Sequence, residues 1–159
     1  MVCCSAVPSP RCALAVPIRN HNCAISDGEI GFGRMDALAK PKLVAVVEDD
    51  ESVRLALRLL LESDGLSVGT FESAEDFLNS AERPDVACLI VDIRLPGMSG
   101  LELQAKLNAQ RCRIPTIFMT AHGDGQIRMQ AMRQGAVEFF TKPFDDRVLL
   151  NRVQCALEG

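Results

Sequence analysis

Apolar residues follow two different spacings along the chain from position 42 onward. Short continuous apolar runs, typical of strands buried on both faces, occupy residues 43–47, 66–71, 86–92, 114–120 and 136–140. Between these runs, and after the last of them, apolar residues recur every three or four positions, as on one face of a helix. This spacing predicts helices over residues 50–63, 73–78, 99–107, 126–134 and 145–157.

Local signals mark several of the predicted helix ends. Ser73 with Asp76, and Ser99 with Glu102, have the spacing of a capping box, in which a hydroxyl and an acid bind the free N–H groups at the start of a helix. A glycine follows the first and the fourth predicted helices, where it favours a stop because it adopts the left-handed backbone readily.

Strand and helix alternate strictly, which predicts an α/β fold. We expect a doubly wound, five-stranded parallel sheet with strand order 2-1-3-4-5, flanked by five helices in a flavodoxin-like arrangement. In such sheets ligands bind beyond the carboxyl ends of the strands, at the point where the strand order reverses. The residues that follow each strand are therefore the candidates for a site.

Residues 1–40 lack this regularity. They contain Pro8, Pro10, Pro17, Gly28, Gly31 and Gly33, and they show neither a helical nor a strand period. We interpret them as a disordered tail before a domain at residues 41–159. Prolines interrupt the apolar stretch, which argues against a secretory signal, and the four cysteines have no C-x-x-C spacing for zinc. Translation starting at Met35 would remove most of this tail.

Charge and composition exclude some classes of function. A net charge of -4 and a pI near 5.2 give no general basic field, so binding of nucleic acid by the whole surface is not expected. No apolar run reaches the ~18 residues of a membrane span. Cys88, Cys112 and Cys155 lie in apolar segments and fit reduced thiols, which favours a cytoplasmic location.

Acidic residues gather at the ends of the predicted strands. Glu48 and Asp49 follow the first strand, Asp92 ends the third, and Lys142 follows the fifth. With strand order 2-1-3-4-5 the first and third strands are neighbours, so the three carboxylates converge, with Lys142 coming from the other side. Several carboxylates repel one another without a cation, and oxygen ligands of this kind suit magnesium completed by phosphate oxygens.

Four segments resemble the signature segments of the response-regulator receiver domain of two-component signal transduction, the CheY-like superfamily. They are VVEDDESVR, VDIRLPGMSGLEL, MTAHGD and TKPF, in the order and spacing of that family over residues 42–157. MSGLEL, AHGD and GAVEFFTKPF are similar to segments of the subgroup of receivers found on nitrogen-fixation and related two-component regulators. The resemblance implies a domain that takes a phosphoryl group from a histidine kinase or a phosphotransfer protein and is not a conventional enzyme.

The resemblance also implies roles for individual residues. Asp92 is the phosphoacceptor, and Glu48, Asp49, Asp92 and the backbone carbonyl of Arg94 hold magnesium. The acidic pair is Glu-Asp where the family commonly has Asp-Asp, which lengthens one ligand arm.

The same resemblance implies a switch. Thr120 matches the switch hydroxyl, Phe139 the switch aromatic, and Lys142 the lysine that precedes a cis proline. Phosphorylation is then expected to change the face formed by residues 126–134, 136–140 and 145–157, and to promote a symmetric dimer or partner binding there. His122, beside the site, is expected to be a loop residue.

Other classes remain as alternatives. An aspartyl-phosphate phosphatase resembles D-x-D at the end of the first strand, whereas Asp92 is on the third strand and is followed two residues later by Arg94. A flavodoxin-like binder has a Ser/Thr/Gly-rich phosphate loop after strand one, where this chain has four acids. A receiver-like module that no longer takes phosphate is a third alternative.

Two kinds of downstream action fit the predicted receiver. The sequence ends soon after the fifth predicted helix with no helix-turn-helix segment, so direct DNA binding by this chain is not expected. A stand-alone relay and the receiver part of a longer regulator both fit this pattern.

Overall fold

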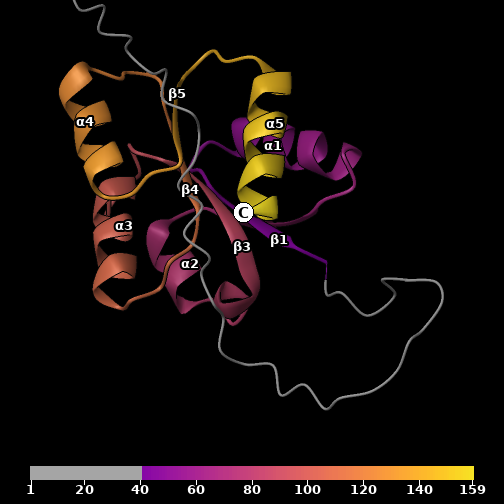
Figure 1. Ribbon diagram of the computed structural model, residues 1–159, viewed down its shortest axis with the longest axis horizontal. Helices are drawn as coiled ribbons and strands as arrows, with labels where there is room; N and C mark the ends of the chain where they lie inside the picture. The colour runs from indigo at the N-terminus through magenta and orange to yellow at the C-terminus, as the bar shows by residue number, and fades with distance from the viewer. Residues whose placement is uncertain (1–40) are drawn as a thin grey trace, which may run out of the picture. The chain divides into compact units, whose positions relative to one another are not determined.

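The computed structural model describes residues 41–159, and the predicted tail at 1–40, with Met35, lies outside them. Strands and helices alternate along the described chain (Figure 1). The strands are β1 (Leu43–Val47), β2 (Ser67–Phe71), β3 (Val86–Asp92), β4 (Thr116–Thr120) and β5 (Glu138–Thr141). The helices are α1 (Glu51–Ser63), α2 (Ala74–Asn79), α3 (Gly100–Ala109), α4 (Gly125–Arg133) and α5 (Asp146–Glu158), with a 3-10 turn at Arg83–Asp85.

The five strands form one parallel sheet in the order β2-β1-β3-β4-β5. The predicted fold class and strand order are therefore confirmed. Helices α1 and α5 cover one face of the sheet, and α2, α3 and α4 cover the other (Figure 1). No helix in the described part of the chain is long and apolar enough to cross a membrane.

Two apolar cores form because side chains alternate between the faces of each strand. In β1, Val44 and Val46 pack with Leu57 of α1, whereas Ala45 and Val47 pack on the opposite face. Every residue of β1 after Leu43 is buried, which explains why this strand reads as a continuous apolar run.

Strand boundaries differ from the prediction where the backbone is engaged elsewhere. β4 begins at Thr116 and not at Ile114, because Pro115 has no N–H to donate to a ladder. β5 begins at Glu138 and not at residue 136, because Ala136 N–H donates to Ala131 O at the end of α4. The pairing instead extends to Thr141, opposite Thr120.

Side-chain caps fix the residues at which α1, α2 and α3 begin. Asp50 caps α1 by accepting from the N–H groups of Ser52 and Val53. Ser99 and Glu102 form the predicted capping box of α3. Ser73 accepts from the N–H of Asp76 at the start of α2, which is one half of the predicted box.

Candidate functional site

Three carboxylates meet at the carboxyl end of the sheet. Glu48, Asp49 and Asp92 each place an oxygen within 4.8 Å of the other two. Glu48 is 1% exposed and Asp92 is 6% exposed, whereas Asp49 is open to solvent. The sheet brings them together because Val47 of β1 pairs with Val91 of β3, so that Glu48 and Asp92 follow at the same level.

Lys142 reaches this cluster from the end of β5. Its ammonium lies 2.7 Å from Glu48 Oε2 and 2.7 Å from Asp92 Oδ2. The peptide bond between Lys142 and Pro143 is cis. The lysine therefore bridges the two buried carboxylates and leaves Asp49 free to face solvent.

The electrostatics of the cluster are dominated by burial. Burial raises the pKa of Glu48, and nearby Asp92 adds to this, while the hydrogen bond from Lys142 opposes it. Burial alone would lower the pKa of Lys142, but its hydrogen bonds to Asp92 and Glu48 outweigh that effect and the pKa is raised. The pKa values of Glu48 and Lys142 are therefore both raised. For Glu48 the reason is that the cost of burying its charge exceeds the stabilisation by Lys142.

The cluster fits a divalent cation. Three carboxylates face a single ammonium, so two negative charges stay uncompensated when all are ionised. Hard oxygen ligands, one of them exposed to water, match the preference of magnesium for carboxylates plus retained waters.

The loop after β3 folds back onto Asp92. The backbone N–H of Arg94 donates to Asp92 Oδ1 at 2.7 Å, which fixes one carboxylate oxygen. Gly100, the first residue of α3, lies so close that an added Cβ would be 2.5 Å from the Asp92 carbonyl oxygen. The glycine that ends the MSG segment therefore sets how closely α3 approaches the strand end.

Thr120 and Phe139 lie on neighbouring strands. Thr120 is fully buried, and its hydroxyl oxygen accepts from His122 N–H at 3.2 Å. Phe139 is 7% exposed and pairs with Phe118, two residues before Thr120. His122 itself is an exposed loop residue, as predicted.

Arg54 is a contact of the site that sequence reasoning missed. Its guanidinium Nη1 donates to the backbone carbonyls of Glu48, at 2.8 Å, and Asp49, at 3.4 Å. Nη2 pairs with Glu72 at 3.1 Å. The arginine at the end of VVEDDESVR thus holds the backbone of the acidic pair from the first turns of α1.

The comparison with family models decides the relationship. The model described as "Response regulator receiver domain" matches residues 44–154. The chain belongs to this family. The predicted resemblance is confirmed, and the acidic cluster of this receiver domain is compatible with a magnesium site.

The receiver is similar to several curated regulatory proteins over only part of their length, as two of them illustrate. It is 44% identical over 114 residues to transcriptional regulatory protein FixJ of Azorhizobium caulinodans, which covers 72% of this chain and 54% of the relative. It is 47% identical over 127 residues to nodulation protein W of Bradyrhizobium diazoefficiens, covering 79% and 55%. The chain therefore spans about half the length of these curated relatives.

Solved structures agree with the fold. The crystal structure of FixJ-N has a TM-score of 0.67 at 40% identity and covers 75% of this chain and 95% of that chain. The response regulator StyR has a TM-score of 0.69 at 47% identity and covers 75% and 60%.

Proposed function

We propose that this receiver takes a phosphoryl group from a phosphohistidine onto the Asp92 carboxylate and thereby changes a protein-interaction face. The observation that supports this most directly is the position of Asp92, which shares one cluster with Glu48 and Asp49 and lies 2.7 Å from the Lys142 ammonium.

The transfer joins a carboxylate oxygen to phosphorus. Asp92 Oδ2 attacks the phosphorus atom, the phosphorus–nitrogen bond of the donor breaks, and the electron pair leaves with the imidazole. Arg94 N–H holds Oδ1, so that the attacking oxygen has a defined direction. Lys142 contacts the Asp92 carboxylate before transfer and would contact the phosphoryl oxygens during it. Its positive charge, already in place, would stabilise the charge that develops there in the transition state.

Magnesium would be held by Glu48, Asp49 and Asp92, with the Arg94 carbonyl as a further ligand, and when bound it would neutralise charge on the phosphoryl oxygens. The exposed position of Asp49 leaves room for water and for the phosphoryl group.

The switch would begin at Thr120. Phosphorylation adds about -1.5 to -2 charge and three strong acceptors at the strand end. The Thr120 hydroxyl, which accepts from His122 N–H, keeps its own proton free to donate to a phosphoryl oxygen. Phe139 would respond to that movement and alter the face of α4, β5 and α5.

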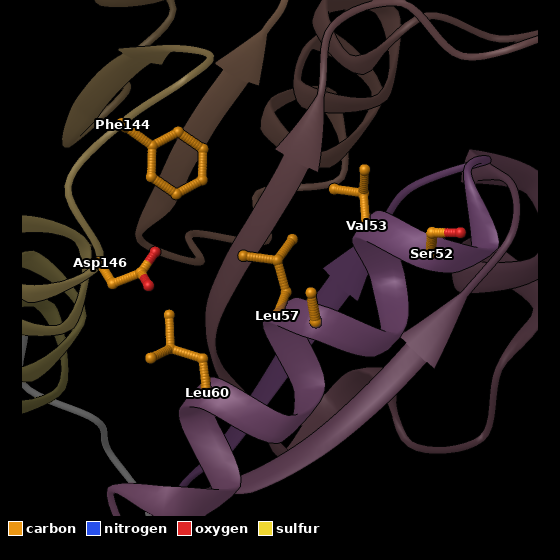
Figure 2. Close-up of a pocket in the computed structure, with 7 residues that line it drawn as sticks. Ser52, Val53, Leu57, Leu60, Phe144 and Asp146 are labelled. Carbon is orange, nitrogen blue, oxygen red and sulfur yellow. The ribbon is translucent and has the colours of Figure 1, made fainter.

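A groove beside the cluster suits the partner that carries the phosphohistidine. Figure 2 shows side chains from one face of α1 opposite Phe144 and Asp146, which lie just before and at the start of α5. The groove that they line has a volume of about 310 Å³. Most of its lining is apolar: Val53, Ala56, Leu57 and Leu60 of α1 with Phe144, joined by Ser52 and Asp146. Both walls start next to the cluster, because Ser52 follows the acidic run and Phe144 follows Lys142. An amphipathic helix of a histidine kinase or phosphotransfer protein fits such a groove.

The phosphoacceptor is tested by incubation with acetyl phosphate and magnesium, followed by intact-mass measurement. We expect one added phosphoryl group on the wild type and none on Asp92→Asn. Equal incorporation in the two proteins would refute Asp92 as the acceptor.

The groove is tested by comparing two donors. Leu60→Glu should slow transfer from a phosphorylated histidine kinase by about tenfold, since it places a charge in an apolar contact. It should leave transfer from acetyl phosphate unchanged. An equal loss with both donors would mean that the substitution acts on the cluster and not on docking.

A further inference from the structure

The loop between β4 and α4 contacts the ring of Phe139 at Gly123. A Cβ at this position would lie 2.9 Å from Phe139 Cε1, 3.1 Å from Cζ, and 3.0 Å from Thr141 Oγ1. Gly123 is not among the glycines with positive φ. Its backbone therefore suits any residue, and the requirement for glycine is one of space alone.

The other end of this loop holds Thr120. The N–H of His122, the residue before Gly123, donates to Thr120 Oγ1 at 3.2 Å. One short segment thus contacts the switch hydroxyl through its backbone and the buried aromatic ring through its glycine. A displacement of the loop at one of these contacts should also displace the other, because the contacts are made by the consecutive residues His122 and Gly123.

The loop also leads into α4. Asp124 caps this helix by accepting from Ile127 N–H at 2.8 Å. A displacement at Gly123 is therefore passed to the start of the helix whose exposed surface includes Met129 and Met132.

We propose that Gly123 is a positioning residue for Phe139: its missing side chain lets the aromatic ring stay buried against the loop, and this contact links Thr120 to the surface of α4 and β5. The proposal rests on the proposed function for the link to phosphorylation, and on geometry alone for the position of the ring. A methyl group at this position forces the ring edge outward or the loop away from β5.

The first test reads the ring directly. Protein labelled with 4-fluorophenylalanine is compared by ¹⁹F NMR, with the Phe139 signal assigned from its loss in Phe139→Leu. Gly123→Ala should move this signal and raise its solvent isotope shift between H₂O and D₂O, because the ring becomes more exposed. Gly125→Ala is the matched control: it lies two residues away, and a Cβ there has nothing within 4 Å. The control should leave the Phe139 signal in place.

The second test measures coupling to the cluster. Gly123→Ala should weaken binding of beryllofluoride in the presence of magnesium by about three- to tenfold, in the range of coupling between residues in contact. In the Phe139→Leu background the same substitution should have little further effect, since the ring that it displaces is gone. Gly125→Ala should bind as the wild type does.

The outcomes separate this inference from the proposed function. An unmoved Phe139 signal in Gly123→Ala, or an equal loss of affinity with and without the Phe139 ring, would overturn the role of Gly123 while Asp92 remained the phosphoacceptor. If the wild type binds no beryllofluoride, the proposed function fails, and the ¹⁹F comparison still decides whether Gly123 positions the ring.

Discussion

The Lys142 ammonium lies 2.7 Å from Asp92 Oδ2, although 50 residues separate the two along the chain. The same ammonium is 2.7 Å from Glu48 Oε2, and both carboxylates are almost fully buried. One cation thus serves two acids, so the cluster of three carboxylates retains an excess of negative charge.

Replacing this lysine should separate metal binding from signalling. Lys142→Met should still bind magnesium, because the proposed ligands are oxygens, but should lose the change in amide exchange across residues 126–157 on phosphorylation. Without metal it should be less stable by up to about 3 kcal/mol, since buried carboxylates lose their partner. Titration calorimetry, hydrogen exchange and denaturant unfolding measure the three effects, and Lys106→Met on α3 is the control for loss of a lysine. A response equal to that of the wild type would refute the role of Lys142.

Magnesium binding should be weak and should depend on Asp49. Asp49→Ala should lower the affinity by about tenfold or more, because ligands and their supports commonly contribute this much. Asp50→Asn is the matched control: it removes the neighbouring charge and keeps an oxygen that can cap α1. Equal affinities of Asp49→Ala and the wild type would remove Asp49 from the metal site.

The position of the acids was open to prediction because it depends only on strand order. Once β1 and β3 are neighbours in a parallel sheet, Glu48 and Asp92 must lie side by side. The strict alternation of strands and helices also predicted the two-faced core. β4 and β5 were misplaced by two residues at their starts because Pro115 and the end of α4 take backbone groups out of the ladder.

Other contacts of the site depend on how whole elements pack. Arg54 reaches the carbonyls of the acidic pair only because α1 leaves β1 at a particular angle. Gly123 meets Phe139 only because the β4–α4 loop lies over β5. A local pattern carries no signal for either contact, since each glycine or arginine could equally serve a turn or a solvated helix face.

Arg54 should affect metal binding without being a ligand. Arg54→Met removes the bonds to the carbonyls of Glu48 and Asp49, so we expect about tenfold weaker magnesium binding, in line with other supporting residues. Arg58→Met on the same helix is the control, because Arg58 pairs with exposed Glu62 and not with the cluster. Equal magnesium affinities of Arg54→Met and Arg58→Met would contradict the positioning role.

Glu48 should make the metal-free protein less stable as pH rises. Burial raises its pKa above the ordinary value of 4.5, so the folded state holds this proton more tightly than the unfolded state does. Stability from this group is present below pH 4.5 and is lost as pH rises through the raised folded pKa. The glutamine side chain of Glu48→Gln does not ionise, so this variant keeps its stability as pH rises. We expect it to be more stable than the wild type at neutral pH by about 1 kcal/mol.

Denaturant unfolding from pH 4 to 8 without metal checks this dependence. The advantage of Glu48→Gln should shrink as pH falls toward 4.5, and added magnesium should reverse it by stabilising the wild type more than the variant, which keeps Asp49 and Asp92 but lacks one carboxylate ligand. A difference in stability that does not vary with pH would show that the titration of Glu48 is not its cause.

Phosphorylation should promote association through α4, β5 and α5. Four of the six exposed large apolar side chains of the described residues lie on or between these elements: Met129, Met132, Val137 and Val148. Exposed apolar side chains are a common feature of interaction surfaces when they gather on one face. A modification shifts an equilibrium only through a difference between the two states, and in the proposed switch this face is the one that Thr120 and Phe139 connect to Asp92.

We therefore expect a mainly monomeric protein whose sedimenting mass doubles with beryllofluoride and magnesium. Met129→Asp should abolish the increase, because a charge in the centre of an apolar interface is not compensated there. Leu59→Asp on α1 is the matched control, since Leu59 is 57% exposed and Met129 is 55% exposed. An unchanged mass, together with unchanged amide exchange across residues 126–157, would refute a switch read on this face. If the wild type does associate, loss of association in Leu59→Asp but not in Met129→Asp would place the interface on α1.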